Sequence, residues 1–255
     1  MIVIFAAMKD ELAALSPPLG SMARIAAAPL PAYQTTLAEA PVAFVLTGVG
    51  RQRAESTANW ALAALTPERV LAVGISGALI PGLPAASVLA CSDLVAVDDR
   101  LPPITADPAM LVAAQGALGR FSAGHRHGRC VTLPKVAETP QEKELLHRRY
   151  DAVLVDMESY WLAKACQARG VPFLAVRAVS DPLEANLAGL NSVLQEDGQS
   201  PDPKALLRGL LRRPALLPAL LRLGLDTRRA SRSLAAVLHA FLPALARQEI
   251  ASSPC

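Results

Sequence analysis

Three carboxylates, Glu11, Glu158 and Asp181, each follow a short apolar segment of this 255-residue chain. The segments before them, at residues 2–6, 152–155 and 173–179, predict β-strands. In open α/β sheets, ligands bind beyond the carboxyl ends of the strands, so the three side chains can converge. Taken singly, an acidic residue after a strand is more often a helix cap or a solvated loop charge. It is the group of three that indicates a site.

Asp181 stands immediately before Pro182, which favours an extended backbone and prevents an immediate helix start. We therefore expect its side chain to be presented at a strand exit. A carboxylic acid aimed at a purine ring nitrogen can protonate the base as the glycosidic bond breaks. The sugar then develops positive charge, as in glycoside hydrolysis, where a second carboxylate activates water. We assign the acid role to Asp181 and the water-activating role to Glu11.

Glu158 follows a predicted strand and precedes a helical pattern. A helix N-terminus favours negative charge, so we expect its carboxylate to be ionised. An ionised carboxylate accepts two hydroxyl hydrogen bonds, and the ribose 2′,3′-diol offers two donors that would fix the sugar's position.

Two glycine-containing segments are interpreted as turns at strand ends: Thr-Gly-Val-Gly at 47–50 and Gly-Ile-Ser-Gly-Ala at 74–78. Glycine there lets a ligand approach the backbone, although tight turns alone explain both segments equally well. Neither matches a dinucleotide-binding fingerprint or a P-loop, which argues against a dinucleotide or nucleoside triphosphate ligand.

Short apolar runs alternate with helical patterns through the first 180 residues, which predicts an α/β fold with a buried, mixed or parallel sheet covered by helices. The predicted strands are 2–6, 42–46, 70–73, 88–97, 129–133, 152–155 and 173–179. The predicted helices are 10–15, 51–65, 108–118, 141–150 and 159–169. We assign residues 1–185 to a catalytic domain, 186–203 to a polar loop and 204–255 to a basic amphipathic helical extension.

The extension is expected to form two or three helices, with Pro214 and Pro218 at their starts or breaks. Its leucines and its excess of Lys and Arg suit a helix that lies on an anionic membrane surface or covers an apolar ligand. An ordinary helical hairpin, packed on the core or at a dimer interface, is the alternative.

Composition and charge limit the classes of protein to which this chain can belong. The net charge of +3 gives no reason to expect a nucleic-acid partner, and no uncharged apolar run approaches the roughly 18 residues of a membrane span. The apolar N-terminal segment lacks a preceding basic segment and is followed by charged residues too soon to be a signal peptide, so we expect a cytoplasmic protein.

The cysteines show no metal-binding spacing and are interpreted as buried reduced thiols, and we assign no metal and no cofactor. The cysteines are Cys91, Cys130, Cys166 and Cys255.

Five segments, taken together and in order, resemble the nucleoside phosphorylase and nucleosidase superfamily, in particular the methylthioadenosine/S-adenosylhomocysteine nucleosidases. They are Ala-Met-Lys-Asp-Glu at 7–11, the two glycine segments at 47–50 and 74–78, Val-Asp-Met-Glu at 155–158 and Arg-Ala-Val-Ser-Asp at 177–181. The resemblance implies a three-layer α/β/α sandwich around a twisted mixed sheet, assembled as a homodimer or larger oligomer.

The same resemblance implies roles for individual residues. Glu11 would position or activate the attacking water, Met157 and Glu158 would hold the ribose, and Ser180 and Asp181 would act at the purine. The glycine segments would add Gly48, Ser76 and Gly77 to the residues that bind the substrate.

Two departures from the family pattern bear on the reaction. The positions at which related phosphorylases hold phosphate with Arg and Ser look like Ala72 and Ile75, which favours water as the nucleophile. Other arginines, such as Arg51 or Arg53, could compensate. The segment 132–136, Thr-Leu-Pro-Lys-Val, also lacks the aromatic residue that nucleosidases usually place against the base.

The region from residue 178 through the tail further resembles the hopanoid-associated members of the superfamily, which implies removal of adenine from adenosylhopane to give ribosylhopane. We therefore expect a hydrolytic purine nucleosidase acting on a lipid-linked nucleoside. A phosphorylase, a methylthioadenosine/S-adenosylhomocysteine nucleosidase and a non-catalytic nucleoside-binding protein are the alternatives.

Overall fold

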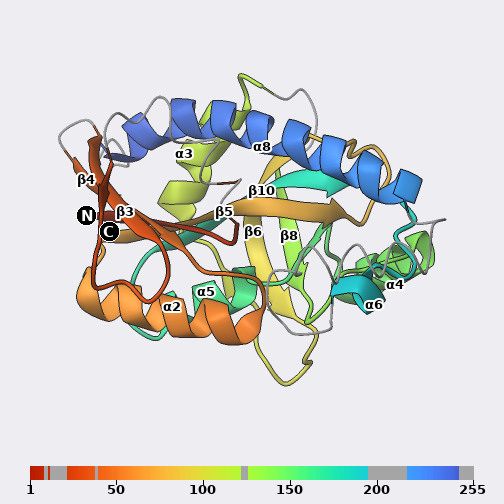
Figure 1. The fold of residues 1–255 in the computed structure, drawn as a ribbon, viewed down its shortest axis with the longest axis horizontal. Helices are drawn as coiled ribbons and strands as arrows, with labels where there is room; N and C mark the ends of the chain where they lie inside the picture. The colour runs from red at the N-terminus through yellow and green to blue at the C-terminus, as the bar shows by residue number, and fades with distance from the viewer. Residues whose placement is uncertain (9–10, 12–21, 38–39, 122–125, 195–216, 247–255) are drawn as a thin grey trace.

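A computed structural model describes residues 1–8, 11, 22–37, 40–121, 126–194 and 217–246. The expected α/β sandwich is confirmed: a mixed ten-stranded sheet lies between two layers of helices (Figure 1). The strands are β1 (Ile2–Ala6), β2 (Ala23–Arg24), β3 (Ala32–Leu37), β4 (Ala40–Leu46), β5 (Arg69–Ala78), β6 (Val88–Ala96), β7 (Ile104–Thr105), β8 (His127–Thr132), β9 (Leu154–Asp156) and β10 (Phe173–Asp181).

The helices are α2 (Arg51–Ala64), α3 (Pro108–Leu118), α4 (Pro140–Tyr150), α5 (Ser159–Gln167), α6 (Leu190–Leu194) and α8 (Leu217–Ala246). In Figure 1, α2 and α5 lie below the sheet and α3 and α8 above it. Two large apolar clusters correspond to these layers: one packs α2 and α5 against the sheet, and the other packs α3 and α8 against its opposite face. The predicted helix at 108–118 is observed with those bounds, and the predicted helix at 10–15 lies, except for Glu11, outside the described residues.

The sheet combines an open wing with a closed ring. The strands β5, β10, β6, β8 and β9 pair in turn and close on β5 again, whereas β1, β4, β3 and β2 extend from the side of β5. Within the wing, β1 runs parallel to both β4 and β5, and β10 runs parallel to β5. The carboxyl ends of these four strands therefore point the same way, and every residue of β1 is buried, as in parallel sheets covered on both faces.

The interpretation of residues 74–78 as a turn was wrong, because they are the second half of β5. Strand β1 ends where Ala6 pairs with Val73, but β5 continues beyond that level. Its continuation is held by β10 on one side and β9 on the other, since Gly77 pairs with both Asp181 and Val155. The 47–50 segment does turn as expected, with positive φ angles of 72° at Gly48 and 90° at Gly50.

The described part of the tail is one 30-residue helix, α8, and the part of the predicted extension that includes Pro214 lies outside the described residues. Pro218 lies in its first turn, where a missing N–H costs nothing, so it starts the helix without breaking it. The buried face of α8 includes Leu234, Leu238 and Phe241, which pack in the same cluster as residues of β1 and β10. This part of the tail is therefore a layer of the fold, and the predicted boundary at residue 185 stays a prediction.

Three cysteines, Cys91, Cys130 and Cys166, are buried free thiols, and Cys255 lies outside the described residues. None of the helices in the described ranges is long and apolar enough to cross a membrane.

Candidate active site

Glu11 is buried just beyond the end of β1. Its Oε2 accepts hydrogen bonds from the N–H groups of Ala7 and Met8 at 2.9 and 3.0 Å, and its Oε1 accepts one from Ile75 N–H at 3.0 Å. Because β1 has already ended at this level, Ile75 of the extended β5 is available to Glu11. Burial raises the pKa of Glu11, and the charge of Arg177 and the three N–H donors only partly oppose that rise.

Glu158 occupies the N-cap position of α5, but its side chain does not cap the helix. Its Oε1 instead accepts a hydrogen bond from Gly50 N–H at 2.8 Å, in the turn that precedes α2. The first N–H groups of α5 are satisfied by Asp156 Oδ2, 3.1 Å from Ser159 N, and by Thr132 Oγ1, 3.1 Å from Tyr160 N. Glu158 is thereby free to face the strand exits.

The expectation that the helix dipole keeps Glu158 ionised was wrong. Burial, reinforced by the neighbouring charges of Asp156 and Glu11, raises the pKa of Glu158 to about 7. The charge of Arg177 and the hydrogen bond from Gly50 lower the pKa, but they do not outweigh burial. Near neutral pH this carboxyl therefore exchanges between its two protonation states.

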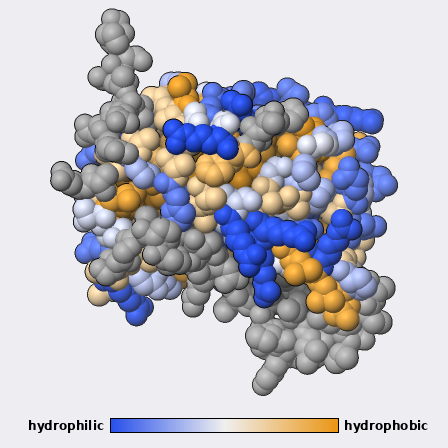
Figure 2. Space-filling view, turned by 90° about the horizontal axis from the view of Figure 1, so that it is seen from above, coloured by the Kyte–Doolittle hydropathy of each residue, from blue (hydrophilic) through white to orange (hydrophobic). Residues whose placement is uncertain are grey.

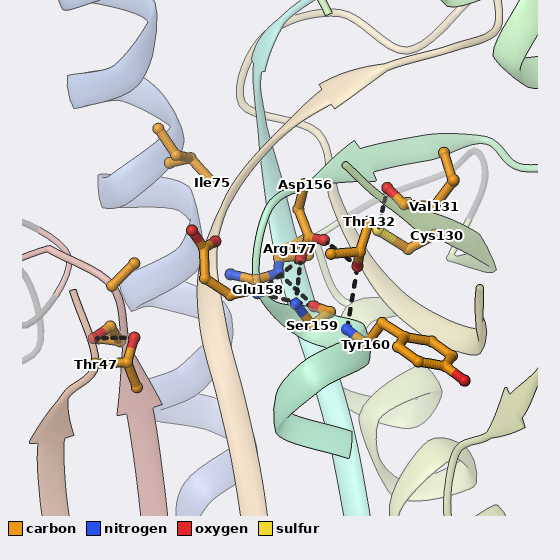
Figure 3. Close-up of polar contacts among 12 residues, drawn as sticks. Thr47, Ile75, Cys130, Val131, Thr132, Asp156, Glu158, Ser159, Tyr160 and Arg177 are labelled. Carbon is orange, nitrogen blue, oxygen red and sulfur yellow. Dashed lines mark hydrogen bonds and ion pairs between the residues drawn. The ribbon is translucent and has the colours of Figure 1, made fainter. Parts of the chain in front are cut away.

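Arg177, inside β10, is the buried cation that these acids share. Its Nη2 lies 2.8 Å from Asp156 Oδ2, and its Nε and Nη2 donate to Ser159 Oγ at 3.0 and 2.8 Å. Thr132 Oγ1 completes the network by donating to Asp156 Oδ1 at 2.6 Å (Figure 3). The charges of Asp156, Glu158 and Glu11 all raise the pKa of Arg177 despite its complete burial.

Arg177 and Asp156 are not among the site residues predicted from the sequence. A signal was present, because Arg177 is the only charged residue in the apolar run 173–179 and a buried charge needs a partner.

Asp181 is the last residue of β10, at a strand exit as expected. Its Oδ1 accepts a hydrogen bond from Ser180 Oγ at 2.7 Å, and its Oδ2 lies 2.7 Å from Nζ of Lys143. The side chain is 11% exposed and lines a cavity of about 360 Å³. Residues of the loop after β10 form one wall, and Pro218, Ala219, Arg222, Leu223 and Asp226 of α8 form the other.

The remaining predicted residues divide between two places. Gly48 lies in the turn after β4, where an added Cβ would come 2.9 Å from the Arg53 side chain, and Met157 is half-buried between Asp156 and Glu158. Ser76 and Gly77 lie on β5 beside the end of β10. An added Cβ on Gly77 would come 2.8 Å from Asp181 Oδ2, and the backbone oxygen of Ser76 lies 3.2 Å from Ser180 Oγ.

The structure thus brings Glu11 and Glu158 together around Arg177, and it places Asp181, Ser180, Ser76 and Gly77 in a second group along β5 and β10. Ser76 Oγ is buried and has no hydrogen-bond partner among the described residues. Most buried hydroxyls in proteins are hydrogen-bonded, so this one is available to a bound molecule.

Three of the four positions considered for phosphate, Ala72, Ile75 and Arg51, are apolar or already engaged. Ala72 is fully buried in the apolar cluster against α2 and α5, and Ile75 packs against the opposite cluster. Arg51 lies 3.9 Å from the centroid of the Trp161 ring and 3.2 Å from Glu55.

Breaking the buried Arg177–Asp156 pair should strongly destabilise the fold. Removing one partner of a buried pair leaves an uncompensated charge and costs about 3–5 kcal/mol, so we expect Asp156→Asn to lower the free energy of unfolding by that amount in urea denaturation. The control is Asp99→Asn, which removes the partner of Arg149 in a pair whose side chains are 63% and 64% exposed. That change should cost less than about 1 kcal/mol. Similar losses in both variants would contradict the stabilising role of the buried pair.

Comparisons with known proteins agree with this fold. The chain is 24% identical over 196 residues to the 5′-methylthioadenosine/S-adenosylhomocysteine nucleosidase of Staphylococcus haemolyticus, covering 71% of this chain and 86% of that protein. It is 32% identical over 157 residues to the futalosine hydrolase of Streptomyces coelicolor, covering 53% and 65% respectively.

Among solved structures, the 5′-methylthioadenosine/S-adenosylhomocysteine nucleosidase of Neisseria meningitidis, in complex with methylthio-immucillin-A, matches with a TM-score of 0.76 at 18% identity, covering 95% of this chain and 98% of that chain. The futalosine hydrolase of Helicobacter pylori gives 0.76 at 17% identity, covering 94% and 96%. The model of the phosphorylase superfamily matches residues 1–201, and the chain belongs to that superfamily.

Proposed function

We propose that the protein is a purine nucleosidase that hydrolyses an N-glycosidic bond and releases adenine. The observation that carries the proposal is the carboxyl of Asp181, held by two donors at the exit of β10 and facing a cavity. The nucleosidases and futalosine hydrolases among the relatives support the reaction class. Adenine is the proposed base because the Ser180–Asp181 pair resembles that of the adenine-releasing nucleosidases.

In the proposed reaction, Asp181 delivers a proton to a purine ring nitrogen. The electron pair of the glycosidic bond then leaves with the base, and positive charge develops on the ribose. Water attacks the anomeric carbon and loses a proton to Glu11. Because burial raises the pKa of Glu11, its carboxylate is a stronger base than an exposed one would be.

Glu158 is proposed to accept the ribose hydroxyl hydrogen bonds, with Met157 packed beside the sugar. The unpartnered Ser76 hydroxyl offers the substrate a further hydrogen bond, and Gly48 and Gly77 allow close approach of the ligand to the backbone. All these residues follow β4 or β9 or lie on the extended part of β5.

Hydrolysis is favoured over phosphorolysis because Ala72 and Ile75 offer phosphate neither charge nor hydroxyl, and because Arg51 is engaged by Trp161 and Glu55. Arg53 beside Gly48 is the cation that would support the phosphorolytic alternative.

The proposed substrate is adenosylhopane, which would yield ribosylhopane. Support comes from the cavity beside Asp181, whose lining includes Leu187 and, from α8, Pro218, Ala219 and Leu223. An apolar lining of this kind suits a substrate that carries a large hydrophobic group. Methylthioadenosine and S-adenosylhomocysteine are the alternatives.

The exposed surface of α8 supports delivery of such a substrate from a membrane. Leu217, Leu221 and Leu225 are 47%, 64% and 57% exposed, and the exposed Arg228 and Arg232 continue their row. At 3.6 residues per turn, all five fall within about 80° of the helix circumference. Figure 2 looks down on this face of the molecule, where apolar patches lie beside strongly hydrophilic ones. We propose that this leucine–arginine row contacts anionic lipid at the inner face of the membrane.

Adenine release by the purified protein tests the reaction. We expect release from adenine nucleosides without phosphate, with a higher kcat/KM for adenosylhopane than for methylthioadenosine. Asp181→Asn should lower kcat by about 10²–10⁴-fold, the usual contribution of a general acid, with KM changed little. Strict dependence on phosphate would reject hydrolysis, and an unaltered kcat in Asp181→Asn would remove Asp181 from its role.

The raised pKa of Glu158 predicts a pH-dependent KM. Only the ionised carboxylate accepts both ribose hydroxyls, and with a pKa of about 7 its fraction rises about tenfold from pH 6 to pH 8. KM should therefore fall about tenfold over that range. Glu158→Gln should give a higher KM that no longer follows this change, measured alongside Glu55→Gln, a half-buried residue of α2, as the control. A pH-independent KM in the unmodified protein would contradict the role given to Glu158.

Vesicle co-sedimentation tests the leucine–arginine row. The unmodified protein should sediment with anionic vesicles more than with neutral ones, and Leu221→Glu combined with Leu225→Glu should abolish the difference. Val112→Glu, at a position of α3 that is 68% exposed, is the matched control and should bind normally. Equal sedimentation of the double variant and the unmodified protein would refute the membrane contact.

A further inference from the structure

Lys143 is buried in a way that its helix does not explain. It is the one buried residue of α4 and is 0% exposed, whereas Leu145 on the same helix is 65% exposed. An amphipathic helix normally buries its leucines and exposes its lysines. Because burying an unpaired ammonium is strongly unfavourable, this inversion requires compensating contacts.

Those contacts all lie at the exit of β10. Nζ of Lys143 is 2.7 Å from Asp181 Oδ2, 3.3 Å from the backbone oxygen of Asp181 and 2.8 Å from that of Pro182. An ammonium has three N–H donors, so each has an acceptor here. Lys143 thus holds both the carboxyl of Asp181 and the backbone on which it is mounted.

This arrangement bears on the source of the proton that leaves with the base. Both oxygens of Asp181 already accept hydrogen bonds, one from Ser180 and one from Lys143. The hydroxyl of Ser180 is a weak acid, whereas the ammonium carries an exchangeable proton and a positive charge. Of these two donors, Lys143 is the one suited to supply a proton.

We propose that Lys143 is a positioning residue for Asp181 and the store of the proton that Asp181 passes to the departing purine, an inference that rests on the proposed function. Asp181 gives a proton to the purine ring nitrogen, and Nζ of Lys143 gives a proton to the Asp181 carboxylate. The electron pair of the glycosidic bond goes to the base. Lys143 becomes a neutral amine. The attacking water gives a proton to Glu11. Afterwards Glu11 releases that proton to solvent, and the neutral amine of Lys143 takes up a proton from solvent.

The other charged groups that face this pair are on the cavity wall. Glu184 follows β10, and Arg222 and Asp226 belong to α8. Asp226 lies 3.7 Å from Arg222 and 3.3 Å from Arg229, and the side chains of Arg222 and Glu184 are exposed. Within the described residues, Lys143 is therefore the cation placed in direct contact with Asp181.

The test measures kcat at saturating nucleoside, which separates it from the effect of Glu158 on KM. At pH 7.5 we expect Lys143→Met to lower kcat by about 10²–10⁴-fold. The loss should shrink by about tenfold per unit as the pH is lowered to 6, because Asp181 then takes its proton directly from solvent. Lys164→Met, at an exposed position of α5, is the matched control and should retain the kcat of the unmodified protein.

Two results would overturn the inference: a loss below about threefold at pH 7.5, or a loss of the same size at every pH, which would mark a purely structural role. If Lys143→Met does not fold, Lys143→Gln, which keeps a hydrogen-bond donor without the charge, is tested for the same loss of kcat and the same pH dependence. If the unmodified protein releases no adenine, the proposed function itself fails. If it does and Lys143→Met is equally active, only the role of Lys143 fails.

Discussion

The buried guanidinium of Arg177 is the charge on which the arrangement of acids depends. Three carboxylates, those of Asp156, Glu158 and Glu11, raise its pKa, and they lose most of their water on burial. Removing an ion from water costs several kcal/mol, so burying these acids around a neutral side chain would be unfavourable. Asp156 takes the direct ion pair and Ser159 accepts from Nε and Nη2, while the charges of Glu11 and Glu158 act on Arg177 electrostatically.

Space for this cation is made by a glycine. An added Cβ at Gly74 would come 2.1 Å from Nη1 of Arg177 and 2.9 Å from Oε1 of Glu11, so a larger residue there would displace both side chains. Gly77 does the same beside Asp181, at 2.8 Å from its Oδ2. Both glycines lie inside a strand and have ordinary φ angles, so their small size, and not a turn, explains their presence.

The sequence predicted the elements whose pattern is local. Adjacent residues explain three of these elements: the apolar run of β1, the helix α3, which begins at Pro108 after Asp107, and the strand exit at Asp181 before Pro182. Residues 74–78 were misinterpreted because the strands that keep them extended, β9 and β10, come some 80 to 100 residues later in the chain. The protonation of Glu158 was misjudged for the same reason, since its burial is a property of the assembled fold.

The burial of Lys143 could not be predicted from the sequence. It stands among the charged residues of α4, and nothing in their spacing separates the one buried ammonium from its exposed neighbours. The role of Thr132 in the segment 132–136 was also not predicted. This segment lacks the aromatic residue usual in nucleosidases, and Thr132 hydrogen-bonds both to Asp156 and to the first turn of α5. The roles of the site residues and the domain boundary at residue 185 remain predictions.

Helix α8 connects the acid to the outside of the molecule. Its inner face packs with β10 in the core, its first turns line the cavity beside Asp181, and its exposed face carries the leucine–arginine row. These three surfaces lie on one helix, so the membrane contact proposed above would bring the cavity wall close to the lipid surface. A substrate whose apolar part stays in a membrane could then reach Asp181 along α8 without crossing open water, which is the physical reason to consider substrate choice and membrane contact together.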